Sequence, residues 1–181
     1  MPDGTPPKDP GFPTTQYPPV GSNDGGTGHW SIVNRAGASS NSLDHQERVT
    51  GVGGIGIPKP DAPDPASGIP LTGDDLLHRT LEYKQDGVHF DGHLWRQHPD
   101  GTPQEIFLEA KAHYNFFLEP WAGEGKLDEI TTGMYDQMDR QLRVLPPGAK
   151  LEWHFQEEEF ANHIREELPA HLREVEIYWT P

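Results

Sequence analysis

Two tight turns divide residues 79–112 into three segments in which apolar and polar residues alternate. Asp86-Gly87 separates RTLEYKQ from VHFDGHLW, and His98-Pro99-Asp100-Gly101 separates that second segment from EIFLEAKA. An Asp-Gly pair between alternating segments is a strong hairpin signal, because both residues tolerate the left-handed backbone of a two-residue turn. These residues therefore predict an antiparallel meander of three strands.

Residues on either side of the meander predict further helices and strands. Apolar residues recur every three or four positions over 127–145, which indicates an amphipathic helix that ends at the following Pro-Pro-Gly. Strands are expected over 150–156 and 175–179, and helices over 160–168 and 43–50. The predicted fold class is thus α/β (α+β): a three-strand antiparallel meander followed by helical crossovers to further strands.

Glycine and proline are concentrated in the first part of the chain, where residues 1–70 hold 12 of the 19 prolines and 12 of the 20 glycines. Residues 1–41 are polar and aperiodic, and they offer too little apolar surface to offset the entropy of ordering. The sequence predicts a disordered linker over 1–41, one domain over 42–181, and a loop over 51–73 inside that domain. GVGGIG, which starts that loop, lacks the preceding strand of a dinucleotide-binding fingerprint.

Composition excludes several classes of site. The 181 residues include no cysteine, which rules out disulfides, cysteine-ligated metals and thiol nucleophiles. The chain has no long apolar run and no secretory signal pattern, so we expect no membrane association and no export by the general secretory route. A formal charge of −15 repels nucleic acid at long range unless cations intervene.

Three residues of the meander form a candidate catalytic group. Side chains on a strand repeat every two residues, so Glu109 and Lys111 share one face of the third strand, and the antiparallel hairpin allows a register in which Asp91 lies opposite Glu109. Phe107 lies on the same face and apolar residues lie on the other, so the strand is expected to be buried on both sides, where unpaired charges are costly. Two close carboxylates with the carbonyl of Ala110 suit Mg²⁺ or Mn²⁺. The pattern predicts metal-dependent phosphodiester hydrolysis, in which the lysine orients the attacking water and offsets charge on the phosphate.

The helix over 127–145 adds polar candidates. Gln141 falls within its apolar arc and Gln137 at the edge, so both amides need partners in the interior, either in the core or at the catalytic centre. Arg140 lies outside the arc, where it is either a surface residue or a phosphate contact. His89, Asp91 and His93 alternate along one strand, which is an alternative pattern for a transition metal. A solvated Glu-x-Lys ion pair without catalysis is the plainest alternative.

The ordered series GVHFDGHLW, FLEAKAHYNFF, YDQMDRQ, LEWHFQEEEFA and EIYWTP resembles the restriction-endonuclease-like toxin domains of bacterial polymorphic toxin systems, specifically the fifth Tox-REase family. HQERVTG at 45–51 is similar to the segment that opens that domain. The resemblance implies a PD-(D/E)XK nuclease core in which Asp91 is the acidic residue and Glu109-Ala110-Lys111 the (D/E)XK motif. It matches the helix glutamine to Gln137 or Gln141, and it suggests Glu47 as a further metal ligand.

The resemblance also implies a biological setting. It predicts a DNase toxin and type VI secretion effector that an injection apparatus delivers into the cytoplasm of rival bacteria, with a cognate immunity protein that protects the producer. The linker over 1–41 would then contact secretion-apparatus or chaperone proteins. Because the acidic charge disfavours DNA, two alternatives stay open: an RNA-cleaving toxin of the same fold, and a non-catalytic acidic binding module.

Overall fold

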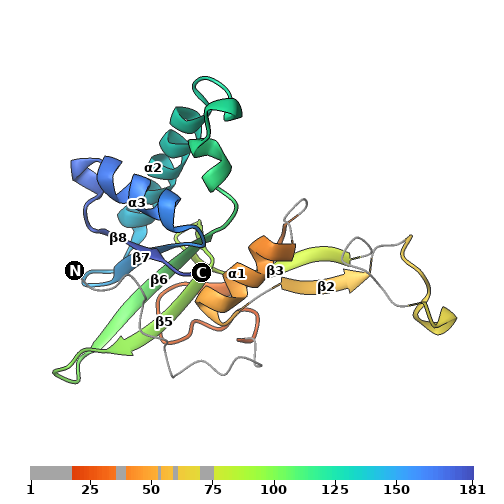
Figure 1. The fold of residues 1–181 in the computed structure, drawn as a ribbon. Coiled ribbons are helices and arrows are strands. Elements are labelled where there is room, and N and C mark those ends of the chain that lie inside the picture. Colours follow the sequence, from red (N-terminus) through yellow and green to blue (C-terminus); the bar gives the residue numbers. More distant parts are fainter. Residues whose placement is uncertain (1–17, 36–39, 53, 59–60, 70–75) are drawn as a thin grey trace.

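The computed structural model describes residues 18–35, 40–52, 54–58, 61–69 and 76–181 (Figure 1). Eight strands form two four-stranded sheets in this part of the chain, and three α-helices accompany them. The strands β2 and β3 extend away from the second sheet, whereas α2 and α3 lie together beside β7 and β8 (Figure 1). The two sheets meet close to Asp91, and this junction positions the candidate site.

The first sheet has β3 (Leu76–Gln85) at its centre. All of its pairings are antiparallel: β3 pairs with β1 (His29–Asn34), β2 (Gly54–Pro58) and β4 (Val88–Phe90). The predicted hairpin between β3 and β4 is confirmed. Its turn residues Asp86 and Gly87 both have positive φ, 46° and 84°, as a two-residue hairpin turn requires.

The second sheet has the order β5-β6-β7-β8. β5 (Gly92–Gln97) and β6 (Pro103–Lys111) pair antiparallel, whereas β7 (Lys150–Phe155) and β8 (Val175–Trp179) continue the sheet in parallel. Parallel neighbours need crossover connections, and α2 (Lys126–Val144) and α3 (Glu158–Glu167) supply them. The predicted fold class is confirmed, including the helical crossovers.

The predicted second strand of the meander is not continuous. It breaks at Asp91, so that β4 belongs to the first sheet and β5 to the second. A Cβ atom on Gly92 would lie 2.8 Å from the Thr50 side chain, at the end of α1 (Ser40–Thr50). Only glycine fits this close approach, which lets the chain pass from one sheet to the other.

Structure also begins earlier than the sequence predicts. β1 lies within the segment expected to be a linker, and its Trp30 is fully buried. The Tyr83 hydroxyl donates to the Asn23 carbonyl at 2.8 Å, which ties the preceding loop to β3. β2 and a short 3₁₀ helix, Pro65–Ser67, occupy the expected loop over 51–73. The linker boundary at residue 41 is therefore wrong for residues 18–35, and residues 1–17 lie outside the described part.

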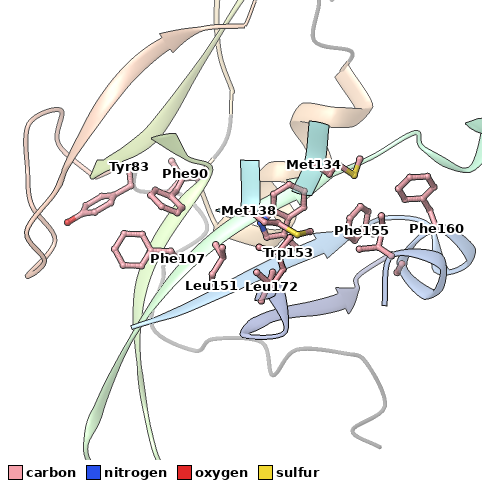
Figure 2. Close-up of a cluster of buried hydrophobic side chains, with 14 of the residues drawn as sticks. Tyr83, Phe90, Phe107, Met134, Met138, Leu151, Trp153, Phe155, Phe160 and Leu172 are labelled. Carbon is pink, nitrogen blue, oxygen red and sulfur yellow. The ribbon is translucent and has the colours of Figure 1, made fainter. Parts of the chain in front are cut away.

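The main core lies between α2, α3 and the sheets. Tyr83, Phe90 and Phe107 gather at one end, and Phe155 and Phe160 at the other (Figure 2). Met134 and Met138 of α2 pack between them against residues of β7, as the helical period predicts. β6 is buried on both sides, since Ile106 and Leu108 form a second cluster with Leu94 on its other face. Glu109 and Lys111 therefore lie at the end of a strand that is largely shielded from water.

Candidate active site

Asp91, Glu109 and Lys111 lie around one cavity of about 450 Å³. The β5–β6 register pairs Gly92 with Leu108, so the next position outward brings Asp91 beside Glu109, as the hairpin predicts. Both carboxylate residues are only 3% exposed. The structure thus gathers the three residues that the sequence singles out.

The cavity wall combines four parts of the chain: Arg35, the α1 residues Ser42, Leu43 and Gln46, the bend at Asp91, and residues 109–114. Ala110, the expected carbonyl ligand, is part of this wall. Glu47, the expected fourth metal ligand, is not: α1 turns Gln46 toward the cavity instead. Successive side chains on a helix differ by about 100° in direction, so Glu47 points in another direction than Gln46.

Glu109 receives three hydrogen bonds from cationic or amide groups. Lys111 Nζ and Gln137 Nε2 each donate to Oε1 at 2.7 Å, and Gln141 Nε2 donates to Oε2 at 2.8 Å. Lys111 Nζ also donates to Gln137 Oε1 at 3.1 Å. Both glutamines therefore donate to Glu109, whereas the sequence alone did not decide between them. Among the hydrogen bonds described, only Gln137 also contacts Lys111.

Gln141 is fully buried and is held from two sides. Trp153 Nε1 donates to Gln141 Oε1 at 2.9 Å, and Gln141 Nε2 also donates to the His89 carbonyl at 3.3 Å. The Lys111 ammonium lies 4.7 Å from the centre of the Trp153 ring, within range of a cation–π contact. Trp153, a core residue as predicted, thereby supports the amide and the ammonium together.

The pKa values of Asp91 and of Lys111 are both raised, but for different reasons. Burial, and next the nearby Glu109, raise the pKa of Asp91 above its ordinary value, because two carboxylates repel each other in a dehydrated site. Burial alone would disfavour the ammonium of Lys111, but Glu109 and Asp91 outweigh it and raise the pKa of that amine. Lys111 is therefore a stable positive charge at neutral pH, suited to stabilising negative charge.

The remaining sequence candidates lie elsewhere. Arg140 is exposed on α2 and does not line the cavity. His93 is buried away from Asp91: its ring nitrogens lie 2.8 Å from Glu105 Oε1 and 3.2 Å from Asp24 Oδ2, and its ring stacks on Tyr83. The described residues contain no group of three or more His, Asp or Glu arranged to hold a metal ion. The alternating-histidine interpretation of a metal site is therefore wrong for this structure.

Two charged residues at the site are not among those that the sequence predicts. Arg35 donates to Asp91 Oδ1 at 3.1 Å and through Nε to Glu82 Oε1 at 2.6 Å. Arg35 lies in the segment predicted to be a linker, where the alternation of HWSIVN just before it was the available signal for a strand. Glu82 alternates with Leu81 and Tyr83, a pattern typical of an exposed face, yet it is only 2% exposed.

The donor set at the cavity fits a hard divalent cation. Mg²⁺ keeps several waters and binds through one or two carboxylates, so Asp91 and Glu109 with the Ala110 carbonyl offer the types of ligand that it takes. Burial, and next repulsion from Glu109, raise the pKa of Asp91, and a cation between the two carboxylates would relieve that repulsion.

Residues 72–158 match the family model described as restriction endonuclease fold toxin 5. This range spans β3 to β7 and includes Asp91, Glu109, Lys111 and both α2 glutamines, but not Arg35. Comparison with curated proteins and with solved structures gave no significant match. No helix in the described part of the chain has the length and apolar character needed to cross a bilayer. The family match and the mixed α/β architecture together assign residues 72–158 to a restriction-endonuclease-like toxin domain.

Proposed function

We propose that the chain is a DNase toxin that hydrolyses phosphodiester bonds with Mg²⁺ or Mn²⁺. The observation that carries this proposal is the meeting of Asp91, Glu109 and Lys111 around one cavity within a toxin-family domain. A restriction-endonuclease-like toxin family suggests a nuclease, and a carboxylate pair beside a lysine is the chemistry that such hydrolysis requires.

Each residue has a distinct role in the proposed reaction. Asp91, Glu109 and the Ala110 carbonyl would hold the cation, which would polarise a phosphate oxygen and lower the pKa of a bound water. The Lys111 ammonium orients the attacking water and stabilises the negative charge that develops on the phosphate. Gln137, which contacts both Glu109 and Lys111, fixes the distance between ligand and ammonium.

The acidic surface is compatible with a nucleic-acid substrate only if local charge differs from the net charge of −15. Lys111 and Arg35 line the cavity, and a divalent cation would add two further positive charges there. Encounter with DNA should consequently depend strongly on the divalent cation, beyond the requirement of the chemical step.

The direct test is incubation of the protein with plasmid DNA and, separately, with transfer and ribosomal RNA. We expect cleavage of the plasmid with Mg²⁺ or Mn²⁺, none with EDTA, and none by Asp91→Ala. Asp128→Asn, which removes an exposed carboxylate from the first turn of α2, is the control and should cleave normally. Degradation of RNA with intact plasmid would replace DNA by RNA as the substrate, and cleavage of neither would favour a binding module.

We further propose the setting that the toxin family supports: delivery into rival bacteria by a type VI system, action in the target-cell cytoplasm, and neutralisation by a cognate immunity protein. Secretion-apparatus or chaperone proteins would engage the N-terminal segment. Expression of the wild type should arrest growth, whereas Asp91→Ala should not. A small adjacent gene whose co-expression restores growth would support the immunity partner, and its failure to protect would contradict it.

Substitution of the two α2 glutamines should affect the cleavage rate and the stability of the fold differently. Gln137 is half-buried and Gln141 is fully buried, so Gln137→Leu should leave thermal stability nearly unchanged and lower the cleavage rate about 10- to 100-fold. Gln141→Leu leaves Trp153 Nε1 and Glu109 Oε2 without these partners, which should cost about 1–3 kcal/mol of unfolding free energy. Urea unfolding and initial rates of plasmid nicking measure the two effects, and equal destabilisation by both variants would contradict the assignment.

A further inference from the structure

Arg35 contacts two buried carboxylates while remaining accessible at the cavity. Nε donates to Glu82 Oε1 at 2.6 Å and the Nη2 atom donates to Asp91 Oδ1 at 3.1 Å. The Arg35 side chain is 42% exposed, whereas neither carboxylate exceeds 4%. The guanidinium is thus fixed along one edge and borders the cavity with the rest of the side chain.

Glu82 is a rigid anchor for this arginine. It lies on β3, where Thr80 Oγ1 donates to Oε1 at 3.2 Å, and His89 Nδ1 lies 3.3 Å from Oε2. A guanidinium carries five N–H donors in a planar fork. One edge can therefore remain on Glu82 while another N–H changes partner, in a fixed planar geometry that the three donors on the single nitrogen of a lysine do not provide.

The charges around the cavity indicate when an N–H of Arg35 would leave Asp91 for another acceptor. When all three are ionised, the carboxylates of Asp91, Glu109 and Glu82 outnumber the cations Arg35 and Lys111 by one. An incoming phosphodiester is repelled by this excess, but a divalent cation on Asp91 and Glu109 reverses its sign. The same cation would compete with Arg35 for Asp91 Oδ1, which frees the N–H of Nη2 that donates to Asp91, while Nη2 and Nε both stay beside Glu82 Oε1.

We propose that Arg35 is a phosphate-binding residue: once Asp91 holds the divalent cation, the guanidinium stays anchored on Glu82 and donates to a non-bridging oxygen of the substrate phosphodiester. This assignment rests on the proposed nuclease function and adds a substrate contact from outside the residues that match the family. In the absence of cation and substrate, the same arginine donates to Asp91.

Two measurements on the full chain test the assignment. Calorimetric titration with Mg²⁺ in the absence of nucleic acid reports the competition at Asp91, and kcat and KM on a labelled DNA duplex report the substrate contact. The variants are Arg35→Ala and Arg35→Lys. Arg173→Ala is the matched control, because Arg173 is exposed, carries the same charge and does not line the cavity.

We expect Arg35→Ala to bind Mg²⁺ at least as tightly as the wild type and to raise KM about 10- to 100-fold, the size of a lost charge-assisted hydrogen bond. Arg35→Lys should recover part of this loss, and Arg173→Ala should match the wild type. Weaker Mg²⁺ binding by Arg35→Ala, or a KM equal to that of Arg173→Ala, overturns the assignment.

Removal of Arg35 could unfold the chain, because two buried carboxylates would lose a partner. In that case Arg35→Lys decides: wild-type thermal stability with a raised KM supports the substrate contact, and a wild-type KM overturns it. A wild type that cleaves no DNA overturns the nuclease function and this assignment together, whereas full cleavage by Arg35→Ala removes only the assignment.

Discussion

Glu109→Gln and Lys111→Met should each lower the rate of plasmid cleavage by about 10³-fold or more, since each removes a group that acts on the reacting phosphate. The two variants should differ in Mg²⁺ binding. Glu109→Gln removes a ligand charge and should bind Mg²⁺ weakly. Lys111→Met removes a positive charge 2.7 Å from Glu109 Oε1, and it should bind Mg²⁺ as well as the wild type or better. Initial rates at saturating Mg²⁺ and calorimetric titration together measure these effects.

The matched controls for this experiment are Glu129→Gln and Lys126→Met. These residues form an exposed ion pair at the start of α2, with side chains 67% and 53% exposed, so their loss changes charge in the same way without touching the cavity. Both controls should keep wild-type rates. Cleavage by either site variant at more than about a tenth of the wild-type rate, with the controls behaving as expected, would contradict the assigned chemistry.

Arg96→Ala should destabilise the fold by about 3 kcal/mol at neutral pH, because it leaves the buried Glu152 charge with fewer partners. Arg96 binds both carboxylate oxygens of Glu152 across β6, and the second bond, from Nη2 to Oε2, is 3.0 Å. The His154 ring nitrogen Nε2, 3.1 Å from the same oxygen, remains in the variant and limits the loss. Arg143→Ala, which breaks an exposed pair on α2, should cost at most about 0.5 kcal/mol.

The stability that the Arg96–Glu152 pair contributes should decrease in acid. Burial opposes ionisation of Glu152, but the hydrogen bonds from His154 and Arg96 outweigh it and lower the pKa of that carboxyl in the folded state. The pair therefore contributes its full stability above the pKa of an unfolded glutamate, about 4.3, and loses it as the pH falls through the lower folded value. The difference between wild type and Arg96→Ala should be largest at neutral pH and shrink in acid. Urea unfolding at several pH values measures it, and a pH-independent difference would contradict the role of the charge.

Local periodicity accounts for the parts of the fold that the sequence predicted correctly. Alternation with period two places Glu109 and Lys111 on one face, and the hairpin allows the register, found in the structure, that sets Asp91 beside Glu109. The period of α2 likewise predicts that Gln141 is buried within the apolar arc. These relations depend only on neighbours along the chain, so the printed residues suffice to derive them.

Relations between distant segments were predicted poorly. Glu82 has the spacing of an exposed residue, but it is buried and pairs with Arg35, which lies 47 residues earlier in the chain. The choice between Gln46 and Glu47 depends on the rotation of α1 about its axis, which packing against β6 decides. The division of the second strand at Asp91 depends on the approach of Thr50 to Gly92, again a contact between separate elements.

The sequence by itself determined the two hairpins, the two helical crossovers and the three residues at the centre of the site, because hydrogen-bonded turns and side-chain period are local properties of the chain. Only the tertiary structure decided that Arg35 and Glu82 join this centre, that both glutamines reach Glu109, and that Glu47 does not line the cavity. The physical reason is that burial and ion pairing depend on which distant surfaces meet. Those contacts are fixed by the packing of the two sheets and α1 around Asp91, and no local pattern encodes them.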